Sequence, residues 1–207
     1  MSTRTLPRSH QPTPPRTPLR MLGGVTLCLL AFYVFLCLIS YNQADPSFNR
    51  ATGNPASNAG GYTGALIADL SLQLLGLASA LWVLVPGAWG VKMLRGLPVS
   101  HLWLRSSLLM GALVLCAAWV ASFEPPLSWP IASGFGGMIG STVHDALHVP
   151  FKSLWFMLGF AVVTLVVTSL AFGMSWSEWR GLAAYGKQLA LVASGLVLAL
   201  IDRVRGR

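Results

Sequence analysis

Met21–Ser40 is a run of twenty residues without a single charge, and it constrains the fold more than any other feature of the chain. At roughly 1.5 Å per residue, a helix of this length crosses the roughly 30 Å hydrocarbon layer of a bilayer. Three more apolar runs follow, at about Leu66–Gly90, Ser106–Phe123 and Phe151–Gly173. We therefore predict an all-α polytopic integral membrane protein with four transmembrane helices.

The first run could also be a cleavable signal peptide. It is longer than the apolar segment of about 7 to 15 residues that such peptides carry, and the ISYNQAD that follows has no clear small-x-small cleavage site. The overall composition also favours a membrane protein, because only 10% of the residues are charged, whereas soluble domains have about a quarter. We expect the first run to be retained as an anchor.

The formal net charge of +8 could indicate nucleic-acid binding, but the basic residues lie in the polar segments between the apolar runs. Lys92, Arg95 and Arg105 surround the hairpin between the second and third runs, and four arginines precede the first run. An excess of basic residues in cytoplasmic loops explains this distribution more simply. It predicts that both termini are cytoplasmic and that the loops at about 41–61 and 124–150 lie outside.

Three domains are predicted. Residues 1–20 form a disordered basic cytoplasmic tail, 21–175 a four-helix transmembrane domain, and 176–207 a juxtamembrane cytoplasmic helix and the start of a linker. The apolar run at 188–201 is short for a span, so we expect a C-terminal membrane-associated helix, with a fifth span as the alternative. Pro86 is expected to kink or end the second transmembrane helix.

Asp69 is the acid in the most apolar surroundings, in the stretch GGYTGALIADLSLQLLG at Gly60–Gly76. A carboxylate among transmembrane segments is costly, so it usually has a partner or lies at an interface. We expect Asp69 to cap or hydrogen-bond at the outer interface, since no second intramembrane ionisable group is present to support a proton or ion pathway. Gly76 and Ala80 have the small-xxx-small spacing of close helix packing.

Three motifs could carry chemistry. HDxxH at His144–His148 resembles the paired zinc ligands of metalloproteases, but a third ligand is missing, so a short interfacial helix is expected. GLAAYGKQ at Gly181–Gln188 has the glycines and lysine of a P-loop, but Gln replaces the magnesium-binding hydroxyl and no strand precedes it. Cys28, Cys37 and Cys116 lie within apolar runs without any CxxC spacing and are expected to serve as small packing residues. No cofactor or metal is predicted.

Four segments together resemble a known family. They are SYNQADPSF at Ser40–Phe48, NAGGYTGALIADLSLQLLG at Asn58–Gly76, ASGFGGMIGS at Ala132–Ser141 and GMSWSEW at Gly173–Trp179. In order and in placement they resemble the N-terminal membrane domain of the FtsK/SpoIIIE family of DNA translocases. The residues we single out as structural or assembly candidates are Gly60, Gly61, Gly64, Asp69, Gly76, Asp45, Pro46 and Trp176.

The resemblance implies a noncatalytic anchor and assembly domain in the bacterial inner membrane, at the division septum and involved in chromosome segregation. The partners it implies are other copies of the chain, bacterial division proteins and membrane lipid, with DNA reached only through a motor domain that is absent here. A chain of 207 residues cannot hold that motor, so we expect a fragment or truncated product without enzymatic activity. The alternatives are a membrane metalloenzyme that uses the HDxxH pair and a small transporter subunit that uses Asp69.

Overall fold

The computed structural model describes most of the chain. The described residues are 18–48, 53, 55–126, 129–147, 150, 153–173, 178–181, 183–184, 187–188, 191 and 194–195. The predicted disordered tail up to residue 17, Trp176, His148 and most of the predicted helix at 188–201 lie outside these residues, as does part of the GLAAYGKQ segment. The chain divides into two compact units, Met1–Phe172 and Gly173–Arg207.

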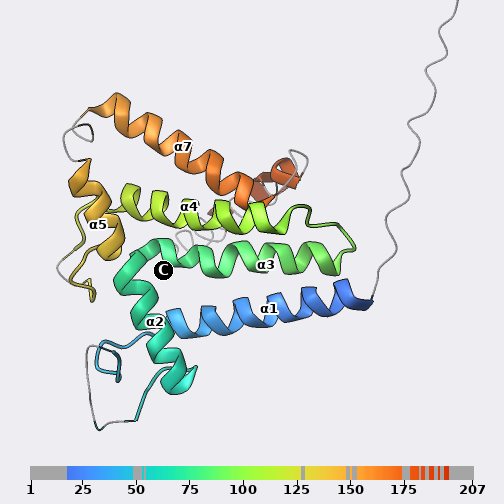
Figure 1. The fold of residues 1–207 in the computed structure, drawn as a ribbon, viewed down its shortest axis with the longest axis horizontal. Helices are drawn as coiled ribbons and strands as arrows, with labels where there is room; N and C mark the ends of the chain where they lie inside the picture. The colour runs from blue at the N-terminus through green and yellow to red at the C-terminus, as the bar shows by residue number, and fades with distance from the viewer. Residues whose placement is uncertain are drawn as a thin grey trace, which may run out of the picture. The chain divides into compact units, whose positions relative to one another are not determined.

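The first unit is built of helices joined by loops, the longest of which are residues 40–60 and 121–136 (Figure 1). They are α1 (Pro18–Ile39), α2 (Gly61–Leu75), the 3₁₀ helix η1 (Gly76–Ala80), α3 (Leu81–Leu94), α4 (Leu102–Val120), α5 (Gly137–Ala146) and α7 (Leu154–Phe172). Four segments are long and apolar enough to cross a membrane, namely α1, the continuous stretch Gly61–Leu94, α4 and α7. The prediction of an all-α protein with four spans is confirmed.

The second span differs from the single helix predicted over about Leu66–Gly90. The helical stretch contains 34 residues, which would extend about 51 Å if straight, well beyond the hydrocarbon thickness. The chain instead changes direction at Gly76, so that α2 runs across the end of the bundle while α3 runs along it (Figure 1). Pro86 lies inside α3, which continues to Leu94, so Pro86 does not end the helix.

Small residues allow the spans to pack closely. A Cβ atom at Gly90 of α3 would lie 2.6 Å from Cys28 Sγ and 2.9 Å from the carbonyl oxygen of Gly24, both in α1. These short distances show that α1 and α3 touch through their backbones. Trp89 Nε1 donates a hydrogen bond of 3.0 Å to the carbonyl oxygen of Ala171, which joins α3 to α7. The core around Val85 and Leu113 is therefore shared by three spans.

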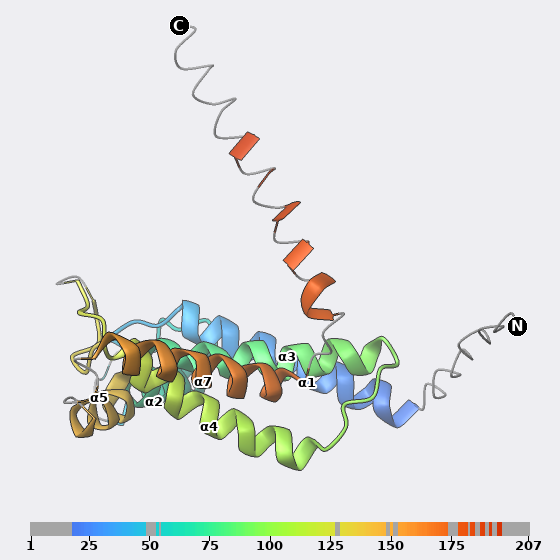
Figure 2. The same ribbon diagram turned by 90° about the horizontal axis from the view of Figure 1, so that it is seen from above.

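Among the residues that the structure describes, the Lys, Arg, Asp and Glu side chains of the first unit separate between the two ends of the bundle (Figures 1 and 2). The start of α1 and the hairpin between α3 and α4 form what we call the basic end. It carries Arg20, Lys92, Arg95 and Arg105. The opposite end, which we call the acidic end, is formed by α2, α5 and the loops beside them, and carries Asp45, Asp69, Glu124 and Asp145.

Candidate functional site

Asn58 fixes the first loop of the acidic end to the end of α1. Its side chain is only 4% exposed. Nδ2 donates to the carbonyl oxygens of Cys37 at 2.8 Å and Ser40 at 3.2 Å, and Oδ1 accepts from the backbone N–H of Gly60 at 2.9 Å. The carbonyl groups at a helix end have no partner within the helix, so a side-chain donor stabilises this end of α1.

Asp45 organises the same loop from its other side. Its Oδ1 accepts from the backbone N–H of Ser57 at 2.8 Å and from the Ser57 hydroxyl at 2.7 Å, and its Oδ2 accepts from the N–H of Asn58 at 2.9 Å. Burial raises the pKa of Asp45, but these three hydrogen bonds favour the ionised form and hold the pKa below its ordinary value. Asp45, beside Pro46, thereby holds the two ends of the loop together.

The start of α2 rests against α1. Tyr33 Oη donates to the carbonyl oxygen of Gly60 at 3.1 Å and lies 3.0 Å from Thr63 Oγ1. Gly60 and Gly64 face Cys37, whose sulfur lies where a larger side chain would be placed. The glycine stretch thus leads from the first loop into α2, which begins in contact with α1.

Gly76 makes the second close contact of the acidic end. The backbone N–H of the next residue, Leu77, donates to the carbonyl oxygen of Phe135 at 2.8 Å. A Cβ atom on Gly76 would overlap that same oxygen and would lie 2.7 Å from the nitrogen of Gly137. The expectation that Gly76 and Ala80 form a helix-packing pair is therefore wrong, because Gly76 ends α2 and packs against a loop.

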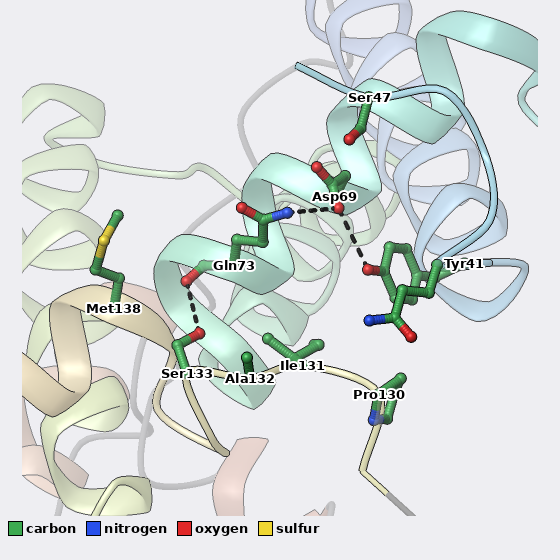
Figure 3. A pocket seen from close by; sticks show the side chains of 10 residues that line it. Tyr41, Ser47, Asp69, Gln73, Pro130, Ile131, Ala132, Ser133 and Met138 are labelled. Carbon is green, nitrogen blue, oxygen red and sulfur yellow. Dashed lines mark hydrogen bonds between the residues drawn. The ribbon is translucent and has the colours of Figure 1, made fainter. Parts of the chain in front are cut away.

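A cleft of about 350 Å³ lies beside α2, between the segment 41–47 and the segment 130–138. Asp69 lies on its α2 side and is only 7% exposed. Asp69 Oδ1 accepts from Tyr41 Oη at 3.2 Å and from Gln73 Nε2 at 2.8 Å (Figure 3). Ser133 Oγ donates to the carbonyl oxygen of Gln73 at 3.2 Å, so the opposite loop is attached to the same helix.

Comparison with known proteins identifies the family. Residues 18–183 match the 4TM region of DNA translocase FtsK/SpoIIIE. The chain belongs to this family. It is 36% identical over 165 residues to a DNA translocase FtsK of Brucella melitensis biotype 1. The aligned residues cover 78% of this chain and 19% of the relative. No solved structure matches the chain.

Two further relatives extend the comparison. A DNA translocase FtsK of Agrobacterium fabrum is 34% identical over 183 residues, 88% of this chain and 19% of the relative. That of Caulobacter vibrioides is 34% identical over 167 residues, 75% of this chain and 20% of the relative. The chain thus spans about a fifth of the length of the curated relatives it matches, and it matches them through a 4TM region.

The structure does not support a metal site in this FtsK-type 4TM region. His144 lies on α5, 3.3 Å from Ser122 Oγ through its Nδ1, and His148 lies outside the described residues. Among the residues that the structure describes, no group of three or more His, Cys, Asp or Glu side chains could hold a metal ion. The described residues therefore do not support the metalloenzyme alternative.

Sequence reasoning missed the residues that surround Asp69. Gln73 lies four residues further along α2, a spacing that places two side chains on the same helix face, so this partner could have been found from the sequence. Tyr41 and Ser133 come from loops 28 and 60 residues away from their partners, and no local pattern indicates those contacts.

Proposed function

We propose that this chain is the membrane anchor and assembly region of an FtsK-like DNA translocase in the bacterial inner membrane. The family match and the four spans support the anchor role. The observation that carries the proposal furthest is the separation of charge between the two bundle ends. It gives the anchor a definite orientation.

Basic residues near the ends of spans are retained on the cytoplasmic side. The basic end is therefore cytoplasmic, and both the start of α1 and the end of α7 lie on that side. The acidic end, with the loops around Asp45 and the cleft beside Asp69, faces the outside. Both termini are then cytoplasmic, which allows a DNA motor to follow α7 in the longer relatives.

The assembly role concerns other proteins rather than DNA. The relatives carry the name DNA translocase and are about five times longer than the part they share with this chain. ATP-driven movement of DNA belongs to parts outside the shared region, so DNA is reached only through such a motor. The partners of this region are other copies of the chain, bacterial division proteins at the septum, and lipid, which covers the exposed apolar side chains of α1 and α7.

Cysteine labelling tests the orientation. Single cysteines at Ala132 and Leu97, both exposed and at opposite ends, are introduced into a chain whose native cysteines are replaced by alanine. A membrane-impermeant maleimide added to intact spheroplasts is expected to label Ala132→Cys, and to label Leu97→Cys only after the membrane is permeabilised. The reverse pattern would overturn the proposed topology.

Microscopy tests the assembly role separately. Residues 1–207 fused to a fluorescent protein are expected to concentrate at division sites. An even distribution around the membrane, at an expression level where the fusion stays intact, would contradict the role at the septum.

A further inference from the structure

Asp69 is nearly buried, yet only one of its two carboxyl oxygens is used within the fold. Tyr41 and Gln73 both donate to Oδ1, and none of the described residues donates a hydrogen bond to Oδ2. Figure 3 shows this second oxygen on the side of Ser47, at the edge of the cleft. Both partners of Oδ1 act as donors to it. The free oxygen therefore faces the cleft as an acceptor for a ligand.

The walls of the cleft indicate what kind of ligand fits. Its volume of about 350 Å³ exceeds the space a bare ion needs and lies near the lower end of ligand pockets, which span roughly 300 to 1,000 Å³. Ser47 and Ser133 supply hydroxyl groups, while Pro130 and Met138 supply apolar surface. A ligand with an apolar stem and a cationic head matches this combination, since such groups pack their stems on apolar surface and keep their charge on polar partners.

The surrounding charge selects the same kind of ligand. Asp69 shares the acidic end with three further described acids, and the described lysine and arginine residues of the first unit all lie at the other end. Like-signed charges around a cleft raise the local concentration of ligands of opposite sign. No described lysine or arginine therefore lies at the same end of the bundle as Asp69.

We propose that the cleft binds an arginine side chain that another protein presents at the acidic end. The planar guanidinium group can donate to Asp69 Oδ2 and to Ser47 Oγ at the same time, and its stem packs against Met138. Lysine is a weaker ligand because its ammonium group lacks the rigid, planar set of N–H donors that a guanidinium group presents. The inference rests on the assembly role proposed above, since a protein partner supplies the arginine, and it names the chemistry by which that partner is recognised.

The test uses the full chain, labelled with ¹³C-methyl methionine and reconstituted in lipid nanodiscs. The Met138 methyl signal is assigned from its loss in a Met138→Leu variant. N-acetylarginine methylamide is the probe, and N-acetylcitrulline methylamide, which has nearly the same shape without the charge, is its control. We expect a saturable shift of the Met138 signal with the arginine probe and at least fivefold weaker binding of the citrulline probe.

Matched variants assign the effect to the cleft. Asp69→Asn keeps the shape and an oxygen that Tyr41 and Gln73 can still donate to, and is expected to weaken arginine binding at least tenfold, because a charge-assisted hydrogen bond becomes a neutral one. Glu124→Gln removes an exposed charge at the same end outside the cleft and should leave binding unchanged. Ser47→Lys tethers a cation beside Asp69 and should abolish the response even if Asp69→Asn does not fold.

Three results would overturn the proposal. They are equal responses to the arginine and citrulline probes, an unchanged response in a folded Asp69→Asn or Ser47→Lys variant, and the same shift with sodium chloride at the same concentration. The outcome is independent of the microscopy experiment. Arginine binding without septal enrichment would refute the assembly role alone, and septal enrichment without arginine binding would refute the cleft proposal alone.

Discussion

Replacing Gly76 with alanine should destabilise the acidic end far more than a glycine-to-alanine change normally does. Gly76 has φ 56° and ψ −134°, a backbone conformation that residues with a Cβ atom rarely adopt. The added methyl group would also overlap the carbonyl oxygen of Phe135 and lie 2.7 Å from the nitrogen of Gly137. Both neighbours are backbone atoms, so no flexible side chain can move aside.

Two contributions add up to the expected loss in the free energy of unfolding. Holding a residue other than glycine in a sparsely populated backbone region costs about 1 to 3 kcal/mol. Forcing an extra carbon into a packed contact costs typically about 1 to 3 kcal/mol. We therefore expect Gly76→Ala to lower the free energy of unfolding by about 2 to 6 kcal/mol. Any loss of the hydrogen bond from Leu77 N–H to Phe135, at 2.8 Å, would add to this.

The assay is unfolding by dodecyl sulfate in mixed micelles, followed by circular dichroism. Gly159→Ala is the matched control, because Gly159 lies within α7 with nothing within 4 Å of its would-be methyl group. The control should change the free energy of unfolding by less than about 1 kcal/mol, in the direction of greater stability, because alanine is the better helix former. If the two variants unfold within about 0.5 kcal/mol of each other, the contact between Gly76 and the 135–137 segment does not exist as described.

Three other perturbations test the rest of the bundle. Asn58→Ala removes three hydrogen bonds, two to carbonyl groups at the end of α1 and one from Gly60 within the first loop, so the free energy of unfolding should fall by about 2 to 4 kcal/mol in the same assay. The pKa of Asp45 is lowered in the folded chain, so its ionised carboxylate stabilises the fold. This stabilisation is complete above the ordinary pKa of about 3.9 and is lost as the pH falls through the pKa of the folded chain. Thermal unfolding should show stability declining below about pH 4, and Asp45→Asn should remove that part of the decline; an unchanged slope would contradict the assignment. Gly90→Ala should cost about 1 to 3 kcal/mol, whereas Gly87→Ala, whose methyl group would meet Ala31 at an ordinary 3.5 Å, should be nearly neutral.

Most of the spans could be predicted from the sequence because a long apolar run without charges is stable in few surroundings other than a bilayer. The first run was expected at Met21–Ser40 and α1 occupies Pro18–Ile39; the fourth was expected at Phe151–Gly173 and α7 occupies Leu154–Phe172. The differences lie at the ends, where α1 continues into the polar residues that precede the apolar run. Hydropathy describes the surroundings of a helix, and it says little about where hydrogen bonding begins and stops.

The acidic end could not be predicted in the same way. Nothing in the pattern Leu66–Gly90 distinguishes a long tilted span from two helices that meet at an angle, since both would be predominantly apolar. The break depends on Gly76 meeting the 135–137 segment, which lies about sixty residues further along the chain. The cleft depends on the same contact, because it holds the segment 130–138 beside α2. Such long-range contacts have no local signature.

The break at Gly76 also explains how an acid can occupy an apolar stretch. If Gly61–Leu94 were one straight span, Asp69 would stand eight residues inside a helix surrounded by lipid, where a charge is costly. Because α2 turns away from the bundle axis, Asp69 instead lies among polar loops, with donors from Tyr41 and Gln73. The glycine and the carboxyl group are thus two parts of one arrangement. Straightening the chain at Gly76 should leave Asp69 without its cleft, so Gly76→Ala is expected to abolish arginine binding as well as to destabilise the fold.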